Sequence, residues 1–475
     1  TVDEGFIVGG PVGDFELLLC HGTVCVVGKM RDLILQLSKS SIYSTNPPNN
    51  INIFIPDGIL IILFILINES DCTPYMFQEA VMPFVIYVFT ISAFALGLAE
   101  FVPIGLTDIM ARGLGVEVEQ SGAAVTTYAL GATFSAPVLS ALTAGWSRKT
   151  VMLATSVIFT LGSLAAAFAF TLPQLLTARF IAGLGHGLFL AVASSTAARL
   201  AGPGNAGRAV AVVFGGFTLA MAIGVPLSTW LAGVVSWRLV LGAIAVFGAL
   251  GFIGLFVGMK DPVRSMPGEH IGSAAKNIGL LLNRKLLSGA LVTVLAYAGS
   301  FTAFTFIAPL LTEVTGISGT TIGLFMLIYG ITAAAGNILG GKLTDSMGID
   351  RANIVIISGI VVVVLGIWLL SSSPVSMGVL VALLGMLTYA AVPALQARLM
   401  DVAERHVPQA HGVAAGLNIA GFNSGIALGS LLGGITITHA GMMYTGISGA
   451  IVCLLGLLLL LSQSRRGTVT PCQQD

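Results

Sequence analysis

Three ionisable residues lie inside long apolar stretches of the sequence: Glu100, Arg179 and His186. A charge in hydrocarbon costs at least about 2.5–3.5 kcal/mol, so such residues usually have a partner and a function. Glu100 lies about six residues before the outer end of its predicted helix, and Arg179 lies about six residues after the outer start of its own. At 1.5 Å per residue, both are therefore roughly 9 Å below the outer surface. We therefore expect an ion pair that takes up and releases a proton. The alternatives are a fixed structural pair, or two side chains that extend to the interface.

His186 follows Arg179 by seven residues, on the same face of a helix and two turns further in. Histidine titrates in the range that suits a proton relay. A neutral histidine that is hydrogen-bonded between helices explains its position equally well. Glu100, Arg179 and His186 are thus the candidate proton-coupling residues.

Uncharged polar residues also lie in the apolar stretches. Tyr128, Asn418 and Asn423 are the candidates for contact with a solute. Buried polar groups need partners, so each of them either joins one helix to another or lines a wet cavity. The sequence contains no Gly-x-Ser-x-Gly, no His-Glu-x-x-His and no phosphate-binding loop, and its five cysteines lack metal-site spacing. We expect no metal and no catalytic site.

These residues belong to a chain of strongly apolar composition. It is 56% hydrophobic and 9% charged, with a mean hydropathy of +0.96, whereas a soluble domain carries about a quarter charged residues. A membrane-spanning helix needs about 20 apolar residues. The hydropathy pattern predicts an all-α membrane protein with twelve spans, at residues 84–106, 121–143, 150–170, 174–198, 209–233, 239–259, 287–311, 320–341, 352–371, 376–398, 412–437 and 442–462.

The loops that connect consecutive spans, here called joints, alternate in charge. The even-numbered joints and the tail carry nearly all the lysines and arginines of this region, whereas the odd joints hold only Arg112 and Arg238. Lysine and arginine are retained on the cytoplasmic side during insertion. We therefore expect a multi-pass protein of the cytoplasmic membrane, with both ends of the helical bundle in the cytoplasm.

The spans form two similar halves. The segment 224–233 in the fifth span aligns with 425–434 in the eleventh at an offset of 201 residues. The predicted organisation is a six-helix bundle over 82–259, a cytoplasmic linker over 260–285, a second bundle over 286–462 and a tail over 463–475. Two equivalent bundles that rock around a central site are typical of secondary transporters.

Residues 1–81 differ from the rest of the chain. Their clean apolar run, residues 59–67, is too short to cross a membrane. We expect an atypical leader that is poorly ordered and dispensable, with Met82 as the natural start.

One joint carries a recognisable motif. The pattern Gly341-x-Leu343-x-Asp345-x-x-Gly348-x-x-Arg351 resembles the loop signature of the major facilitator superfamily. The first-half copy keeps Arg148 and Lys149 but has Ala144 in place of the acid.

Three further segments resemble the same superfamily. Arg179 with the glycines that follow it is similar to its span-four arginine motif, and Gly224-Val-Pro226 to its antiporter motif. The segment 99–106 resembles the first span of bacterial drug and sugar efflux antiporters, in particular arabinose-efflux-permease-like and chloramphenicol-exporter-like proteins.

The resemblance implies a fold of two pseudo-symmetric six-helix bundles and a function. The expected function is proton-coupled export of a sugar, a nucleoside or a drug-like molecule by alternating access. The proton gradient would supply the energy, without a cofactor or nucleic acid, and the protein would be a monomer. A facilitator or a proton symporter that imports its solute is the alternative, and a polytopic membrane enzyme is a more distant one.

The resemblance also assigns roles to residues. Tyr128, Asn418 and Asn423 would face the cavity, and Gly224 and Pro226 would seal the outer side. Six loop residues would gate the cytoplasmic side: Arg148, Lys149, Gly341, Asp345, Gly348 and Arg351. By pseudo-symmetry, Asp345 would meet the start of span five near Arg208 and Ala209 when the cytoplasmic side is closed.

Overall fold

The computed structural model describes residues 83–139, 142–143, 145–201, 206–259, 279, 282–407 and 411–467. The chain divides into two units, Thr1–Ala80 and Val81–Asp475, and all described residues belong to the second. The predicted leader, almost all of the predicted linker 260–285 and the tail beyond residue 467 lie outside the described residues. Every regular element in the described ranges is helical, so the prediction of an all-α protein is confirmed.

The first group of helices, here called the N-terminal group, comes from the first six predicted spans. It consists of α4 (Phe84–Leu114), α5 (Val118–Phe134), the π-helix η2 (Ser135–Leu139), α7 (Arg148–Ala167), α8 (Leu172–Ala201), α9 (Ala206–Leu219), the π-helix η3 (Ala220–Gly224), α10 (Val225–Ala232) and α11 (Trp237–Gly258). Within the group α8 packs against α5 and α7, and α4 packs against α9 and α11.

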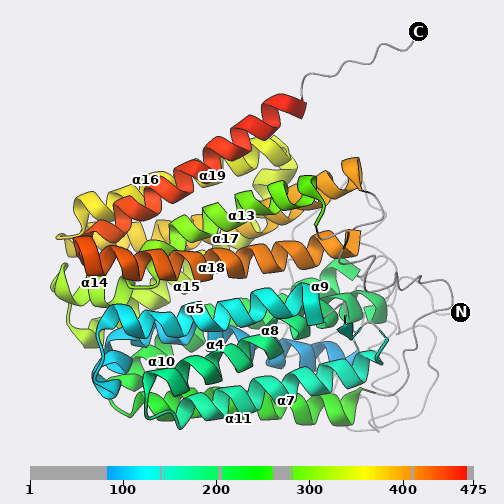
Figure 1. Ribbon diagram of the computed structural model, residues 1–475, viewed down its shortest axis with the longest axis horizontal. Coiled ribbons are helices and arrows are strands. Elements are labelled where there is room, and N and C mark those ends of the chain that lie inside the picture. The colour runs from blue at the N-terminus through cyan, green and yellow to red at the C-terminus, as the bar shows by residue number, and fades with distance from the viewer. Residues whose placement is uncertain are drawn as a thin grey trace, which may run out of the picture. The chain divides into compact units, whose positions relative to one another are not determined.

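The second group, here called the C-terminal group, follows residue 282. It consists of α13 (Arg284–Phe304), α14 (Ile307–Glu313), α15 (Gly319–Met347), α16 (Ile349–Leu370), α17 (Pro374–His406), α18 (His411–Ala440), the short 3₁₀ helix η5 (Met442–Tyr444) and α19 (Thr445–Gly467). These helices gather together in Figure 1, and α18 lies beside α5 of the first group. The domain boundaries themselves stay a prediction.

Eleven helices of the described part are long and apolar enough to cross a membrane, compared with the twelve that were predicted. The difference lies in the second predicted span, where the α-helix α5 has 17 residues and continues as the π-helix η2. Pro137 lies in η2 and has no backbone N–H, so it cannot extend a regular ladder of hydrogen bonds. Single π-turns of this kind are often found at functional sites.

The fifth predicted span is also interrupted. The π-helix η3 separates α9 from α10, and Pro226 occupies the first turn of α10. Pro226 has no backbone N–H, so one hydrogen bond of a continuous helix is missing at this interruption.

Two ends of the bundle can be told apart by their turns. At one end, here called the basic end, three helices have an arginine in their first turn: Arg148 in α7, Arg284 in α13 and Arg351 in α16. The turns at the opposite end contain Gly115, Gly316 and Gly441. Gly348, which joins α15 to α16 at the basic end, has a φ of +83°. Side chains rarely tolerate this conformation, which explains the glycine in the loop motif.

Glycines on α8 let it approach α5 closely. A Cβ atom on Gly183 would lie 2.1 Å from the carbonyl oxygen of Tyr128, and one on Gly187 would lie 2.2 Å from that of Ala132. Small residues at such contacts are how membrane helices pack tightly. The same close approach brings His186, which lies between these glycines, against Tyr128.

Candidate functional site

Four of the predicted residues meet in a buried polar cluster. Glu100 comes from α4, Tyr128 from α5, and Arg179 and His186 from α8. None of the four residues is more than 4% exposed. The structure thus brings Tyr128 together with the candidate proton-coupling residues.

The cluster forms a chain of polar atoms. The Tyr128 hydroxyl donates to the carbonyl oxygen of Leu96 at 3.4 Å, and it lies 2.9 Å from Nδ1 of His186. The other ring nitrogen of His186, Nε2, lies 3.8 Å from Oε2 of Glu100. His186 therefore lies between the hydroxyl and the carboxylate.

Arg179 does not form the direct ion pair with Glu100 that was expected. Its Nε donates to the carbonyl of Ala124 at 3.1 Å and its Nη1 donates to the carbonyl of Ala99. Its guanidinium carbon lies 4.2 Å from the centre of the Tyr128 ring, a cation–π arrangement. Among the described residues, no nitrogen of Arg179 comes within 4 Å of the Glu100 carboxylate, so its charge acts on that group through space.

The reason lies in the lengths of the two helices. α4 continues to Leu114, beyond the predicted end at residue 106, so Glu100 lies about 21 Å from that end of the helix at 1.5 Å per residue. α8 begins at Leu172, which puts Arg179 roughly 10 Å and His186 roughly 21 Å from its start. His186, not Arg179, therefore lies level with Glu100.

An aromatic contact joins the polar cluster to the C-terminal group. The ring of Phe101, next to Glu100, lies 5.5 Å from that of Phe217 on α9. It also lies 6.3 Å from the rings of Phe301 on α13 and Tyr389 on α17. Aromatic pairs at these separations attract each other. Glu100 is therefore located at the boundary between the two groups of helices.

The two predicted asparagines lie elsewhere. Asn418 accepts a hydrogen bond from Thr293 at 3.0 Å and donates one to Gln396 at 2.7 Å, which joins α13, α17 and α18. Asn423 donates to the carbonyl of Ile419 in its own helix at 3.0 Å. Asn418 thus joins helices, which was the alternative to a role in the cavity.

A cavity of about 530 Å³ lies between α5, η2, α13 and α18. Ligand sites typically measure about 300–1,000 Å³. The lining contains three hydroxyl residues, Thr133, Ser288 and Ser424, and is otherwise apolar, with Pro137, Leu287, Ala290, Leu291, Val294, Leu417, Ala420 and Gly421. Tyr128, Asn418 and Asn423 are not among the residues that line this cavity, and their contact with a solute stays a prediction. The sequence carried no signal for the cavity, because its lining residues are ordinary residues of apolar helices.

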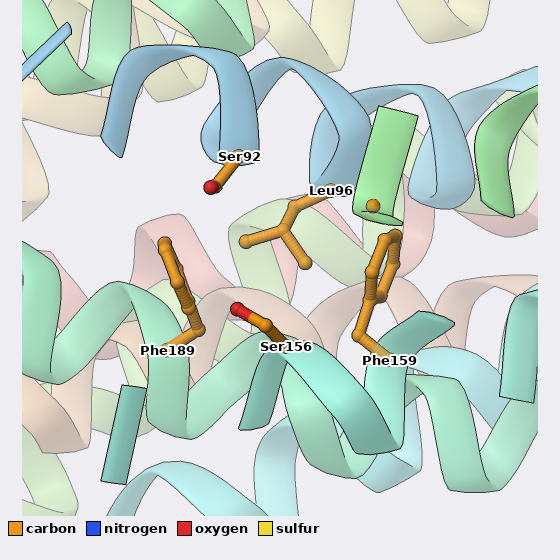
Figure 2. Close-up of a pocket in the computed structure, with 6 residues that line it drawn as sticks. Ser92, Leu96, Ser156, Phe159 and Phe189 are labelled. Carbon is orange, nitrogen blue, oxygen red and sulfur yellow. The ribbon is translucent and has the colours of Figure 1, made fainter. Parts of the chain in front are cut away.

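A second cavity is too small for a solute. Figure 2 shows Ser92 of α4 and Ser156 of α7 on opposite sides of it, with Leu96, Phe159 and Phe189 around them. Its volume is about 10 Å³, which is room for about one water molecule.

The N-terminal and C-terminal groups of helices contact each other towards the end of the bundle that is opposite the basic end. Ser430 on α18 donates to the carbonyl of Gly122 on α5 at 2.9 Å. A Cβ atom on Gly330 of α15 would lie 2.1 Å from the carbonyl oxygen of Met221 in η3. The larger cavity is lined by the first turns of α13 and the last turns of α5 and η2, which lie towards the basic end. The described conformation is therefore closed at the opposite end and hollow towards the basic end.

The predicted loop residues lie at the basic end. Arg148 donates to Ser195 at 2.8 Å and to Thr196 at 3.2 Å, which ties α7 to α8, and Lys149 lies over the ring of Phe256. Gly341 faces open space, and Arg351 is exposed.

Asp345 is exposed at the same end. Within the part of the chain that the structure describes, Asp345 has no hydrogen bond or ion pair. The side chain of its predicted partner, Arg208, lies outside the described residues.

One buried cation escaped prediction. Arg398 on α17 is 4% exposed; its Nη2 donates to Gln463 on α19, and its Nε lies 3.7 Å from Asp350 on α16. The predicted span ended at Arg398, whereas α17 continues to His406. A basic residue at the apparent end of an apolar run looked like part of a joint, and only the packing of α16 and α19 shows that it is buried.

Relatives of known sequence cover most of the chain. An uncharacterized MFS-type transporter of Bacillus subtilis (strain 168), YtbD, is 37% identical over 79% of this chain and 93% of its own length. The chloramphenicol resistance protein of Streptomyces lividans is 29% identical over 75% of this chain and 90% of its own. The purine ribonucleoside efflux pump NepI of Escherichia coli is 28% identical over 76% and 89%.

A solved structure has the same fold. A bacterial homolog of the human lysosomal transporter Spinster, in an inward-facing and unoccupied conformation, superposes with a TM-score of 0.63. The match covers 84% of this chain and 100% of that one at 14% sequence identity, so it supports the fold alone.

The family follows from these matches and from the helices that carry the polar cluster. The relatives are transporters rather than enzymes. The model of the Major Facilitator Superfamily matches residues 89–414, which include all four residues of the polar cluster, and the chain belongs to this superfamily of membrane transporters.

Proposed function

We propose that the protein is a proton-coupled exporter, which exchanges protons for a small neutral or amphipathic solute across the cytoplasmic membrane. The observation that carries this proposal is the Glu100 carboxylate, buried beside His186 and located at the boundary between the two groups of helices. Burying an ionisable residue at membrane depth costs free energy, so such residues usually mark functional sites. Its protonation changes the local charge where the two groups must move past each other.

The cavity supports a neutral solute. Among the described residues, its lining has three hydroxyl groups and no charged side chain. A charged ligand would lose its hydration there without a compensating partner. A sugar, a nucleoside or an amphenicol-like drug suits such a lining, and the printed names of two relatives, a chloramphenicol resistance protein and a purine ribonucleoside efflux pump, favour the last two classes and export.

The proposed cycle has two steps. In the described conformation, the cavity lies towards the basic end of the bundle. From the distribution of lysine and arginine, we expect this end to face the cytoplasm. Solute enters there while Glu100 is ionised. Opening of the other end releases the solute and exposes Glu100 to the more acidic outer solution, where it is protonated before the bundle returns.

Transport in liposomes tests this proposal. The purified protein is reconstituted, a pH gradient is imposed, and the movement of chloramphenicol, a purine ribonucleoside and a pentose is followed together with proton flux. We expect solute movement opposite to proton movement. Glu100→Gln should abolish gradient-driven transport and leave downhill exchange. The matched control is Glu404→Gln, because Glu404 is an exposed acid at the basic end.

Two outcomes contradict the proposal. Full gradient-driven transport by Glu100→Gln would remove Glu100 from proton coupling. Solute that moves in the same direction as protons would instead make the protein a symporter.

A further inference from the structure

The chain of atoms from Leu96 to Glu100 constrains where hydrogens can lie. A tyrosine hydroxyl has one hydrogen to donate and can also accept, a backbone carbonyl only accepts, and a neutral imidazole carries one N–H. The Tyr128 hydroxyl lies between two groups, the Leu96 carbonyl at 3.4 Å and Nδ1 of His186 at 2.9 Å. Its single hydrogen can point to only one of them at a time.

Each orientation of the hydroxyl selects one tautomer of His186. When Tyr128 donates to Leu96, its oxygen must accept from an N–H at Nδ1, and Nε2 is left as an acceptor towards Glu100. When Tyr128 donates to Nδ1, the hydrogen of the imidazole is on Nε2 and points to Glu100. The first arrangement suits a protonated Glu100, and the second suits an ionised one.

We propose that Tyr128 is a positioning residue that sets the tautomer of His186, so that Nε2 exchanges a proton with Glu100. This inference rests on the proposed proton coupling. The step breaks the O–H bond of the protonated carboxyl and forms an N–H bond at Nε2. It leaves a carboxylate beside an imidazolium whose Nδ1–H donates to Tyr128. The reverse step returns the proton. When the imidazolium instead gives its Nδ1 proton to water, which reaches the cluster as the two groups of helices separate, the neutral Nε2–H tautomer remains and Tyr128 turns to donate to Nδ1.

The distances suit this step after a small movement. Nε2 and Oε2 are 3.8 Å apart, and a hydrogen bond needs about 2.9 Å. Catalytic hydrogen bonds are often long before a ligand binds, so a shift of about 1 Å would complete this one. The other partners of His186 are already in place.

The surroundings of His186 hold few groups that titrate. The titratable or charged groups that the described helices place around it are Glu100 from α4, Tyr128 from α5 and Arg179 from α8 itself. From α9 the ring of Phe217 lies 5.8 Å from the imidazole, and from α7 the backbone of Thr155 approaches Gly185. Arg179 lies on the face of the Tyr128 ring and so holds the tyrosine in place.

The second group of helices provides a matched control. A Cβ atom on Gly183 would lie 2.1 Å from the carbonyl of Tyr128, and one on Gly385 would lie 2.5 Å from the carbonyl of Tyr329. Counting three residues onward from each glycine leads to His186 in one group and Thr388 in the other. Tyr329 is therefore the counterpart of Tyr128 without the histidine, and Tyr329→Phe removes a buried tyrosine hydroxyl that has no hydrogen-bond partner among the described residues.

The tautomer can be read by ¹⁵N NMR of histidine-labelled protein in nanodiscs, because protonated and unprotonated ring nitrogens have separate shifts. The His186 signal is assigned by its loss in His186→Gln. We expect Nδ1–H at low pH and Nε2–H once Glu100 ionises, and the same in Tyr329→Phe. In Tyr128→Phe the tautomer should no longer follow pH, and gradient-driven transport should fall about a hundredfold or more while downhill exchange persists.

The outcomes separate this inference from the proposed function. If Glu100→Gln abolishes coupling but Tyr128→Phe keeps both the coupling and the tautomer change, only the inference fails. It also fails if His186 of the parent protein is Nε2–H at every pH, or if Tyr329→Phe loses as much coupling as Tyr128→Phe. If Glu100→Gln keeps its coupling, the proposed function fails. Because the NMR experiment uses the parent protein, it gives an answer even if Tyr128→Phe is poorly expressed.

Discussion

Gly330→Ala should shift the protein away from its described conformation. A Cβ atom at Gly330 would lie 2.1 Å from the carbonyl oxygen of Met221 and 2.6 Å from the Cα of Ala222. Both are backbone atoms of η3, which cannot rotate away as a side chain can. α15 and η3 must therefore separate by about 1 Å before the contact reaches ordinary van der Waals distance.

The size of the shift follows from the cost of overpacking. Inserting a methyl group into a packed contact typically costs about 1–3 kcal/mol. Because α15 and η3 belong to different groups of helices, only conformations that close the opposite end pay this cost. The closed population should thus fall relative to the open one by about 5-fold to 150-fold.

Two glycines on the same helix serve as controls. A Cβ atom on Gly336 would lie 2.0 Å from the carbonyl of Met386 on α17, a contact within the C-terminal group. Gly336→Ala should lower the melting temperature without changing the balance between conformations. Gly319, the first residue of α15, has nothing within 4 Å, so Gly319→Ala should change neither quantity.

Pulsed EPR can measure this balance. Spin labels replace Gln120 and Thr320, two exposed residues near the opposite end that belong to different groups, in a protein without its native cysteines. Gly330→Ala should increase the population at the longer distance. If this variant folds and its distance distribution matches that of the labelled parent protein, the methyl group added at Gly330 does not resist closure and the reasoning is wrong.

Three further predictions concern charged residues. Asp345→Asn should favour the state that is open at the basic end, and it should slow efflux without loss of substrate binding. The reason is that the predicted contact of Asp345 with span five forms only when that end closes. Rates of cytoplasmic cysteine labelling and of efflux equal to those of the parent protein would contradict this prediction. Arg398→Gln should destabilise the protein by about 1–3 kcal/mol through loss of a buried donor, whereas Asp350→Asn, whose carboxylate is 52% exposed, should cost less than about 1 kcal/mol; equal changes in melting temperature would refute the difference. Arg179→Gln should alter the pH dependence of transport, since the cation acts on Glu100 through space, and an unchanged profile in an active variant would leave Arg179 a structural role only.

The residues of the polar cluster could be predicted from the sequence, but their contacts could not. Glu100, Arg179 and His186 stand out because ionisable residues are rare in apolar spans. Their pairing was predicted from depth, and depth was measured from the ends of the apolar runs. Hydropathy marks the part of a helix that suits hydrocarbon, whereas backbone hydrogen bonding continues to Leu114, where Gly115 turns the chain.

The partner of His186 depended on packing. Gly183 and Gly187 allow the close approach of a neighbouring helix. Which helix would approach, and at what height, is set by contacts between α8 and α5 that no periodicity in the sequence reports. For the same reason Tyr128 was placed with the asparagines around a cavity, whereas it lies against His186.

The two halves repeat the arrangement of the backbone, but they do not repeat the ionisable side chains. The 201-residue offset that aligns the two halves pairs Glu100 with Phe301 and Tyr128 with Tyr329. In place of a second acid, the C-terminal group therefore supplies an aromatic ring, and that ring contacts Phe101, the residue after Glu100. Separation of the groups at this level must break the contact between Phe101 and Phe301 and open a path for water to Glu100. Under the proposed proton coupling, a buried carboxylate in one half and an apolar seal in the other would make the ionisation of Glu100 depend on the position of both groups of helices.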